Sequence, residues 1–136
     1  MNPLDRLLFC CFILLATKGH GQSIALFEQH NGRFDYTALG NTLNTSENGA
    51  FTNCSILTGS DADLTLEANQ NIVAAYLYWA GSGSGDFEIN LNGTPIVPER
   101  TFAYALDTNR QFFAAFTEVT ELVQNHGNGT YALTNL

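Results

Sequence analysis

Basic side chains are scarce in this chain. Lysine and arginine together number 5, against 13 aspartate and glutamate residues, and the formal net charge is −8. A surface of that sign repels the phosphate backbone of nucleic acids and the headgroups of anionic membranes. The composition therefore argues against nucleic acid as a partner. It favours solubility and a general attraction for cations.

Cysteine is almost absent beyond the first residues. Of the three cysteines, Cys10 and Cys11 lie in the apolar run from Leu7 to Ala16, so that Cys54 stands alone in the rest of the chain. No lysine, arginine or histidine lies near Cys54 in the sequence, which argues against a reactive thiol of low pKa. Two interpretations stay open. Cys54 is a small buried hydrophobic residue, or it forms a disulfide with a cysteine beyond this chain end.

The apolar run at the amino terminus is typical of a secretory signal peptide. Leu7 to Ala16 is too short to cross a bilayer, which takes about 20 apolar residues. It fits the apolar region of a signal peptide, with Arg6 before it and small residues just before Gln22. We predict a signal peptide over residues 1–21, with a buried first helix or an uncleaved anchor as the alternative.

Removal of residues 1–21 would leave residues 22–136 as the mature chain. This chain of 136 − 21 = 115 residues is long enough for one domain with one core. Two cations and one acid would leave with the signal, so that the net charge would become −8 − 2 + 1 = −9, without any lysine. We therefore expect a secreted or cell-surface protein that does not insert into a membrane after cleavage.

Motifs for catalysis are missing. The sequence has neither a G-x-S-x-G nor an H-E-x-x-H pattern, and His30 and His126 lie in turns rich in glycine and asparagine. Glu118 and Glu121 would need to face each other across a cleft to hydrolyse a glycoside, and we expect them on a helix cap instead. The sequence predicts a protein that is not an enzyme and that needs no cofactor.

The glycine-rich segment Gly81–Gly85 superficially resembles a phosphate-binding loop. The Gly-Lys-Ser/Thr ending of such a loop is missing, and the next residues, Asp86 to Ile89, alternate like a strand instead of opening a helix. We interpret the segment as a flexible connection between strands.

Acidic residues near a predicted turn are the candidate metal ligands. Asp61 and Asp63 could offer oxygens to calcium, with Glu67 and Asp86 as additional candidates. The glycine and terminal glutamate of an EF-hand do not follow at the required spacing. Solvated turn carboxylates are the simpler interpretation, and structural calcium is the alternative.

The clearest strand signals lie between Asn71 and Phe102. The first run, Ile72–Trp79, is apolar on both faces and predicts a central strand that is buried on both sides. The residues from Asp86 to Asn92 alternate between polar and apolar, as in a half-exposed strand. Asn92-Gly93 predicts a tight hairpin, because both residues tolerate a positive φ.

Weaker signals complete the pattern. Further strands are expected at Ser23–Phe27, Phe34–Leu39, Ser55–Thr58, Asp63–Glu67, Phe102–Leu106, Gln111–Val119 and Thr130–Leu136. Gly59-Ser60-Asp61 should turn the chain, and Thr120 should cap one helical turn, Glu121–Gln124. This spacing predicts an all-β fold, an antiparallel β-sandwich or jelly roll. The chain stops inside the last alternation, so we expect the domain to be incomplete at the carboxyl end.

Aromatic residues are frequent for a chain of this size and make up 12% of it. Most should fill the space between two sheets, where each ring buries a large apolar area. A single ring could instead belong to a carbohydrate platform, because sugar rings stack on exposed aromatic side chains. Core packing is the interpretation that we adopt for any one of them.

Two stretches of the sequence resemble a known class of proteins. These are VAAYLYWAGSGSGDFEINLNGTPI, with ERTF behind it, and FFAAFTEVTELVQNHGNGTYALTNL at the end. Over residues Asn53 to Leu136 the chain resembles the amino-terminal β domain of large secreted adhesin-like surface proteins of gliding bacteria. The strongest motifs are Tyr78–Gly83 and Thr117–Thr120, although Glu118 replaces the aspartate of the usual Asp-Val-Thr.

That resemblance implies a signal peptide, this β domain, repeated extracellular modules and a sorting domain for type IX secretion. It also implies a further strand and a further cysteine, with which Cys54 would pair. The order strand, Leu-Asn-Gly, strand, x-Val-Thr-x-Leu-Val, Gly-Asn-Gly, strand is similar to galactose-binding-like jelly rolls. Domains of that kind bind sugars or act as spacers.

Together these observations predict a non-catalytic extracellular β-sandwich module of an adhesin-like protein, serving attachment or structural display. Its partner would be a cell-surface or extracellular polymer, with carbohydrate as one candidate chemistry. The alternative is an accessory carbohydrate-binding module of a secreted polysaccharide-degrading enzyme. Fold analogy does not choose between the two, whereas the domains that follow in the whole protein would.

Overall fold

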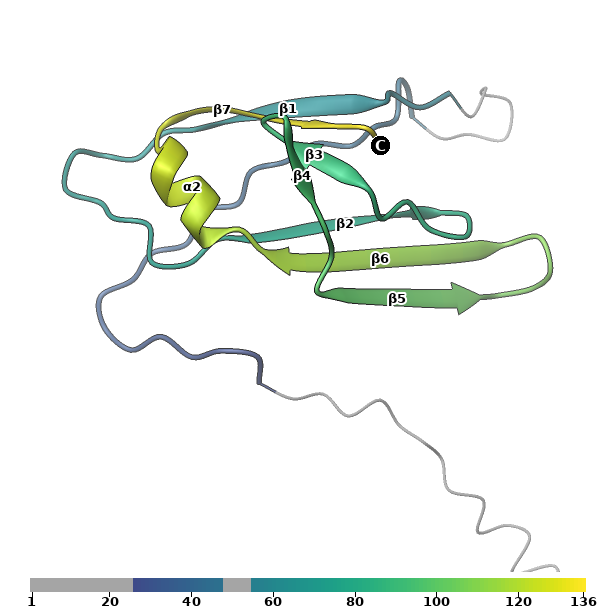
Figure 1. Ribbon diagram of the computed structural model, residues 1–136, viewed down its shortest axis with the longest axis horizontal. Coiled ribbons are helices and arrows are strands. Elements are labelled where there is room, and N and C mark those ends of the chain that lie inside the picture. Colours follow the sequence, from purple (N-terminus) through teal and green to yellow (C-terminus); the bar gives the residue numbers. More distant parts are fainter. Residues whose placement is uncertain (1–25, 48–54) are drawn as a thin grey trace, which may run out of the picture. The chain divides into compact units, whose positions relative to one another are not determined.

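The computed structural model describes residues 26–47 and 55–136 (Figure 1). The predicted signal peptide, residues 1–21, and Cys54 lie outside the described residues and stay predictions. The chain divides into two compact units, Met1–Tyr36 and Thr37–Leu136. In the first unit, residues 26–36 form neither helix nor strand, and the described strands all belong to the second. Within residues 26–47 and 55–136, no helix is long and apolar enough to span a membrane.

Two antiparallel sheets make up the second unit, as far as the structure describes it. The strand orders are β1-β7-β3-β4 in one sheet and β2-β6-β5 in the other (Figure 1). The strands are β1 Gly59–Leu64, β2 Tyr76–Ser82, β3 Ile89–Leu91, β4 Thr94–Ile96, β5 Arg100–Ala105, β6 Gln111–Glu118 and β7 Gly129–Thr134. A short helix, α2 Thr120–His126, connects β6 to β7. The predicted all-β sandwich is confirmed.

The core lies between the two sheets and consists of two buried clusters. One cluster joins the four-stranded sheet to α2 and consists of Leu64, Leu91, Val119, Val123 and Tyr131. The other joins β3 to β2 and β6 and consists of Trp79, Ile89 and Ala115. Leu77, Ile96 and Leu133 pack against both clusters, so that the core is continuous. Each large apolar side chain buried there contributes about 1.5–3 kcal/mol of transfer free energy.

The hairpin predicted at Asn92-Gly93 is confirmed. The two residues have φ values of 50° and 76°, and Leu91 pairs with Thr94 on either side of them. Positive φ at both central residues matches the twist of the flanking strands. The Asn92 side chain also accepts a hydrogen bond at 2.7 Å from the backbone N–H of Ala132 in β7, which fixes the hairpin to the next strand of the sheet.

The prediction of a central strand at Ile72–Trp79 is wrong. The strand begins only at Tyr76, and it is β6 that lies at the centre of the three-stranded sheet, between β2 and β5. Trp79 is 7% exposed, whereas the adjacent Tyr78 is 70% exposed. Both faces of β2 are apolar in sequence, but the structure buries one of them and exposes part of the other.

Further expectations differ from the structure. The strand expected at Asp63–Glu67 ends at Leu64, the last residue of β1. Gly59-Ser60-Asp61 is not a turn but the first half of β1, where it pairs with Ala132–Thr134 of β7. Phe34–Leu39 is not a strand. In the segment Ser55–Thr58 the only pairing is an isolated bridge between Ile56 and Asn44. Whether such a segment forms a strand depends on pairing with a partner that is distant in the sequence. The local sequence does not carry that information.

The short helix is longer than predicted, and Thr120 does not cap it. The residue at the N-cap position is Val119, which makes no side-chain capping bond. The Thr120 hydroxyl instead accepts a hydrogen bond at 2.9 Å from the backbone N–H of Ala75. The Gln124 side chain donates at 2.9 Å to the carbonyl of Ile72, so that α2 is attached to the segment leading into β2.

Tyr131 closes the carboxyl end of α2. Its hydroxyl lies 2.7 Å from the carbonyl oxygen of Gly127 and 3.2 Å from that of Val123, which also accepts the backbone N–H of Gly127 at 2.8 Å. The ring is buried in the core, and this burial raises the pKa of the phenol above its ordinary value of 10.0.

A raised pKa makes the folded state sensitive to alkali. The neutral phenol is the form that the folded protein favours, so its contribution to stability is complete below pH 10 and is lost as the pH rises through the higher folded-state pKa. We expect Tyr131→Phe to lower the free energy of unfolding at pH 7 by about 0.5–1.5 kcal/mol and to flatten its decline above pH 10. Urea unfolding between pH 7 and 11 measures both effects, with the exposed Tyr104→Phe as control. An alkaline decline that is the same in Tyr131→Phe as in the unmodified chain would contradict the assignment.

Candidate functional site

The face of the β2-β6-β5 sheet that points away from the core is the candidate site. Directly paired residues of antiparallel strands lie on the same face, and Trp79 pairs with Ala115, both of which are buried in the core. Their sequence neighbours therefore point outward. We call this surface the outer face; it comprises Tyr76, Tyr78, Ala80 and Ser82 of β2, Phe112, Ala114, Phe116 and Glu118 of β6, and Arg100, Phe102 and Tyr104 of β5.

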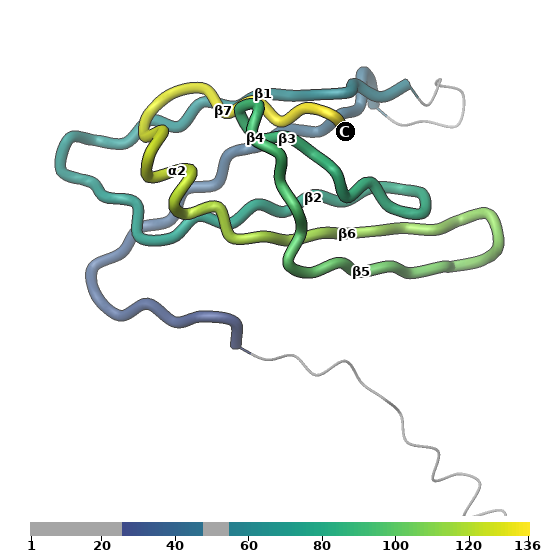
Figure 2. The backbone as a smooth tube through the Cα atoms, viewed as in Figure 1, coloured from purple at the N-terminus to yellow at the C-terminus, as the bar shows by residue number. Residues whose placement is uncertain are grey.

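Aromatic rings dominate the outer face. Tyr78 is 70% exposed, Tyr104 66%, Phe102 48% and Phe112 42%. In the sheet that carries them, β6 lies between β2 and β5 and pairs with both (Figures 1 and 2). Contiguous exposed apolar side chains on a soluble protein mark a surface that binds something, whereas single exposed ones do not. The outer face is the largest such group that the described strands present.

The register orders these side chains into three rows that cross the strands. The rows are Tyr78–Phe116–Arg100, then Ala80–Ala114–Phe102, then Ser82–Phe112–Tyr104. Adjacent rows are two residues apart along each strand, or about 6.6 Å. The first and third rows carry large rings, while two of the three positions in the middle row are alanines. From the sizes of these side chains we expect a shallow trough between the two rows of rings, with Ala80 and Ala114 as its floor.

Phe116 supports the rings of the first row. Although it lies on the outer face, it is only 4% exposed, because neighbouring side chains cover it. Its ring centroid is 4.8 Å from that of Tyr78 and 5.8 Å from that of Tyr76, and the Arg100 guanidinium carbon lies 5.8 Å from it on the other side. Such contacts restrict the rotamers of Tyr78, so that its exposed ring is held before any ligand arrives.

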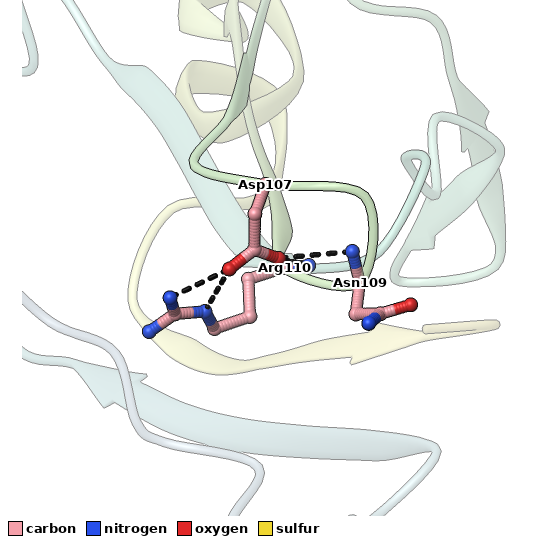
Figure 3. Close-up of polar contacts among 3 residues, drawn as sticks. All are labelled: Asp107, Asn109 and Arg110. Carbon is pink, nitrogen blue, oxygen red and sulfur yellow. Dashed lines mark hydrogen bonds and ion pairs between the residues drawn. The ribbon is translucent and has the colours of Figure 1, made fainter.

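A polar turn borders the face at the third row. It connects β5 to β6, and the Asp107 carboxylate binds the Arg110 side chain there at 2.6 Å and 2.7 Å and accepts the backbone N–H groups of Asn109 and Arg110 (Figure 3). The Arg110 side chain and the Asn109 N–H hold the pKa of this carboxyl below its ordinary value. A concavity of about 370 Å³ next to the turn is lined by Ser82, Gly83, Ser84, Thr108, Asn109, Arg110, Gln111 and Phe112.

A second concavity, of about 790 Å³, lies beyond the opposite end of the face, between β4, the end of β6 and α2. Glu118 and Glu121 both line it, together with Glu99 and His126. The expectation that the two carboxylates sit only on a helix cap is therefore incomplete, because Glu118 ends β6 and both side chains border a hollow. The Glu99 carboxylate accepts a hydrogen bond at 3.3 Å from the backbone N–H of Glu118.

The other candidate residues do not converge. Asp61 and Asp63 lie two residues apart on β1, and Asp63 accepts the Thr130 hydroxyl at 2.6 Å. Within residues 26–47 and 55–136, no three acidic, histidine or cysteine side chains come together as a metal site would require. His30 lies in the first unit, 3.5 Å from Glu28. Glycine-rich Gly81–Gly85 connects strands, as predicted, and its first two residues complete β2.

The sequence alone does not identify the outer face. Its signal was present as aromatic residues two or four apart: Tyr76 with Tyr78, Phe102 with Tyr104, and Phe112 with Phe116. Such spacing puts each pair on one face of a strand. It does not say whether that face is buried, and only the pairing of β2, β5 and β6 shows that the three sets share one surface.

No protein-family model, no curated protein and no solved structure matches this chain.

Proposed function

We propose that this chain is a non-catalytic, extracellular attachment module that binds a carbohydrate polymer through the outer face. The observation that carries the proposal is the row arrangement of exposed rings on one side of the β2-β6-β5 sheet. The C–H groups on the face of a sugar ring are weakly positive, and they are attracted to the negative face of an aromatic ring. Strand positions hold rings more rigidly than loops do, which lowers the entropic cost of binding.

The polar groups around the face suit the same ligand. A sugar needs hydrogen-bond partners for its hydroxyls as well as an apolar surface for its ring. Tyr78 and Tyr104 carry hydroxyls on the exposed rings themselves, and the turn of Thr108 and Asn109 adds further donors and acceptors at the third row. The acidic composition disfavours nucleic acid and anionic membranes as competing partners.

Two kinds of whole protein could carry such a module. The sequence resemblance favours the amino-terminal domain of a secreted adhesin-like surface protein, exported after removal of residues 1–21. The alternative is an accessory module of a secreted polysaccharide-degrading enzyme, for which the same face would bind the substrate. The galactose-binding-like jelly roll and a Cys54 disulfide stay predictions under either one.

The experiment is affinity electrophoresis of the chain in gels that contain single polysaccharides. We expect retardation by at least one polysaccharide. We also expect the double variant Tyr78→Ala with Tyr104→Ala to lose affinity tenfold or more, which corresponds to about 1.4 kcal/mol of binding free energy. Tyr36→Ala is the matched control, since this tyrosine is 84% exposed but belongs to the first unit. No retardation across neutral, amino-sugar and acidic polysaccharides would refute the proposal. Binding that is equally strong in the double variant would place it elsewhere on the molecule.

A further inference from the structure

Strand register and side-chain size define the trough that we expect on the outer face. Ala80 and Ala114 are direct cross-strand partners, so their methyl groups lie next to each other, and Phe102 stands beside Ala114 at the β5 end of the same row. The adjacent rows rise on both sides, with Tyr78 in one and Phe112 and Tyr104 in the other. With strands about 4.8 Å apart, the alanine floor is roughly as wide as one flat six-membered ring.

The charge of the face is as distinctive as its shape. Among the nine positions of the three rows, Arg100 is the only ionisable group apart from the tyrosine hydroxyls, and its guanidinium lies over the Phe116 ring. The rest of the chain is strongly acidic. A polymer of acidic sugars would therefore be repelled by the protein as a whole and would find no matching cation in the trough. An uncharged ligand matches an uncharged surface.

We infer that Ala80 and Ala114 form the floor of a sugar subsite, and that the ligand of the outer face is a neutral glycan with one ring seated in the trough. This inference rests on the proposed function and extends it to a ligand class and to two specificity-determining residues. The seated ring contacts both methyl groups from above and meets the edge of Phe102, while the flanking rings restrict its sideways movement. Any larger side chain at position 80 occupies the volume of the sugar.

The test compares two alanines on opposite faces of one sheet. Ala80→Leu fills the trough, whereas Ala103→Leu adds the same volume to an exposed position of β5 that points the other way. The smaller Ala80→Val is the second variant, because a β-branched residue suits a strand. Hydroxyethyl cellulose serves as the neutral glycan and alginate as the acidic one. Fluorescence of Trp79, the single tryptophan, reports that each variant is folded.

We expect the unmodified chain and Ala103→Leu to bind the neutral glycan with equal Kd, Ala80→Val to bind it more weakly, and Ala80→Leu to lose tenfold or more. Alginate should bind none of them. If both Ala80 variants bind as the unmodified chain does while the tyrosine double variant does not, the sugar subsite at Ala80 and Ala114 is refuted and the proposed function stands. Stronger binding to alginate than to hydroxyethyl cellulose would refute the inference that the ligand is a neutral glycan. If the unmodified chain binds neither probe, the inference fails, and the wider polysaccharide panel decides whether the proposed function fails with it.

Discussion

Trp79→Ala should lower the free energy of unfolding by about 3–5 kcal/mol, the cost of removing a large aromatic side chain from a packed core. Trp79 is 7% exposed, packs with Ile89 and Ala115, and donates its indole N–H to the carbonyl of Asp86 at 2.8 Å. A domain of this size has a total stability of about 5–15 kcal/mol. The variant should therefore lose a large share of the stability of the domain.

The neighbouring residue supplies the control. Tyr78→Ala removes a ring that is 70% exposed and whose main contact is Phe116, so we expect it to cost no more than about 1.5 kcal/mol. Urea unfolding followed by circular dichroism measures both variants without relying on tryptophan. Equal losses from the two substitutions would mean that β2 is buried on both faces, as its sequence first suggested, and that the outer face is not free.

Ile89→Ala should cost about 2–5 kcal/mol, because Ile89 is the most deeply buried large side chain of the described core, at 1% exposed. It lies on β3 of one sheet and packs against Trp79 and Ala115 of the other, so its removal leaves a cavity between the layers. Ile56→Ala is the matched control, since Ile56 is 62% exposed and should change stability by less than about 0.5 kcal/mol.

Trp79 fluorescence during urea unfolding follows this second pair directly, because both variants retain the only tryptophan. We also expect Ile89→Ala to allow more access of small quenchers to Trp79 in the folded state. A loss for Ile89→Ala that is no larger than the loss for Ile56→Ala would show that the sheets do not pack at this point.

Local chemistry explains which parts of the fold the sequence predicts well. Asn92-Gly93 specifies its hairpin through backbone conformations that few other residues adopt, and no distant partner is needed. The alternation that ends at Ile89 and Leu91 likewise identifies the inward positions of β3, because polar residues separate them. In both cases the information lies within a few consecutive residues.

The outer face could not be predicted in the same way. A strand buried on both faces and a strand with exposed aromatic residues have the same apolar pattern. The sequence therefore does not distinguish the buried Trp79 from the exposed Tyr78. Which of these side chains is buried depends on which face of β2 packs against the second sheet. That is decided by strand pairings between residues 30 to 42 positions apart, such as Tyr78 with Phe116. The turn expected at Gly59–Asp61 fails for the same reason, because β7 pairs with it from the other end of the unit.

The β2-β6-β5 sheet buries the side of β2 that carries Trp79 and exposes the side that carries Tyr78. Acrylamide quenching of the single tryptophan in the intact chain tests this most directly, before and after addition of the neutral glycan that it binds. We predict weak quenching in the folded protein, strong quenching in urea, and little change on glycan addition, because the ligand lies on the opposite side of the sheet. Strong quenching in the folded protein that the glycan suppresses would contradict the account, since it would place Trp79 on the binding surface.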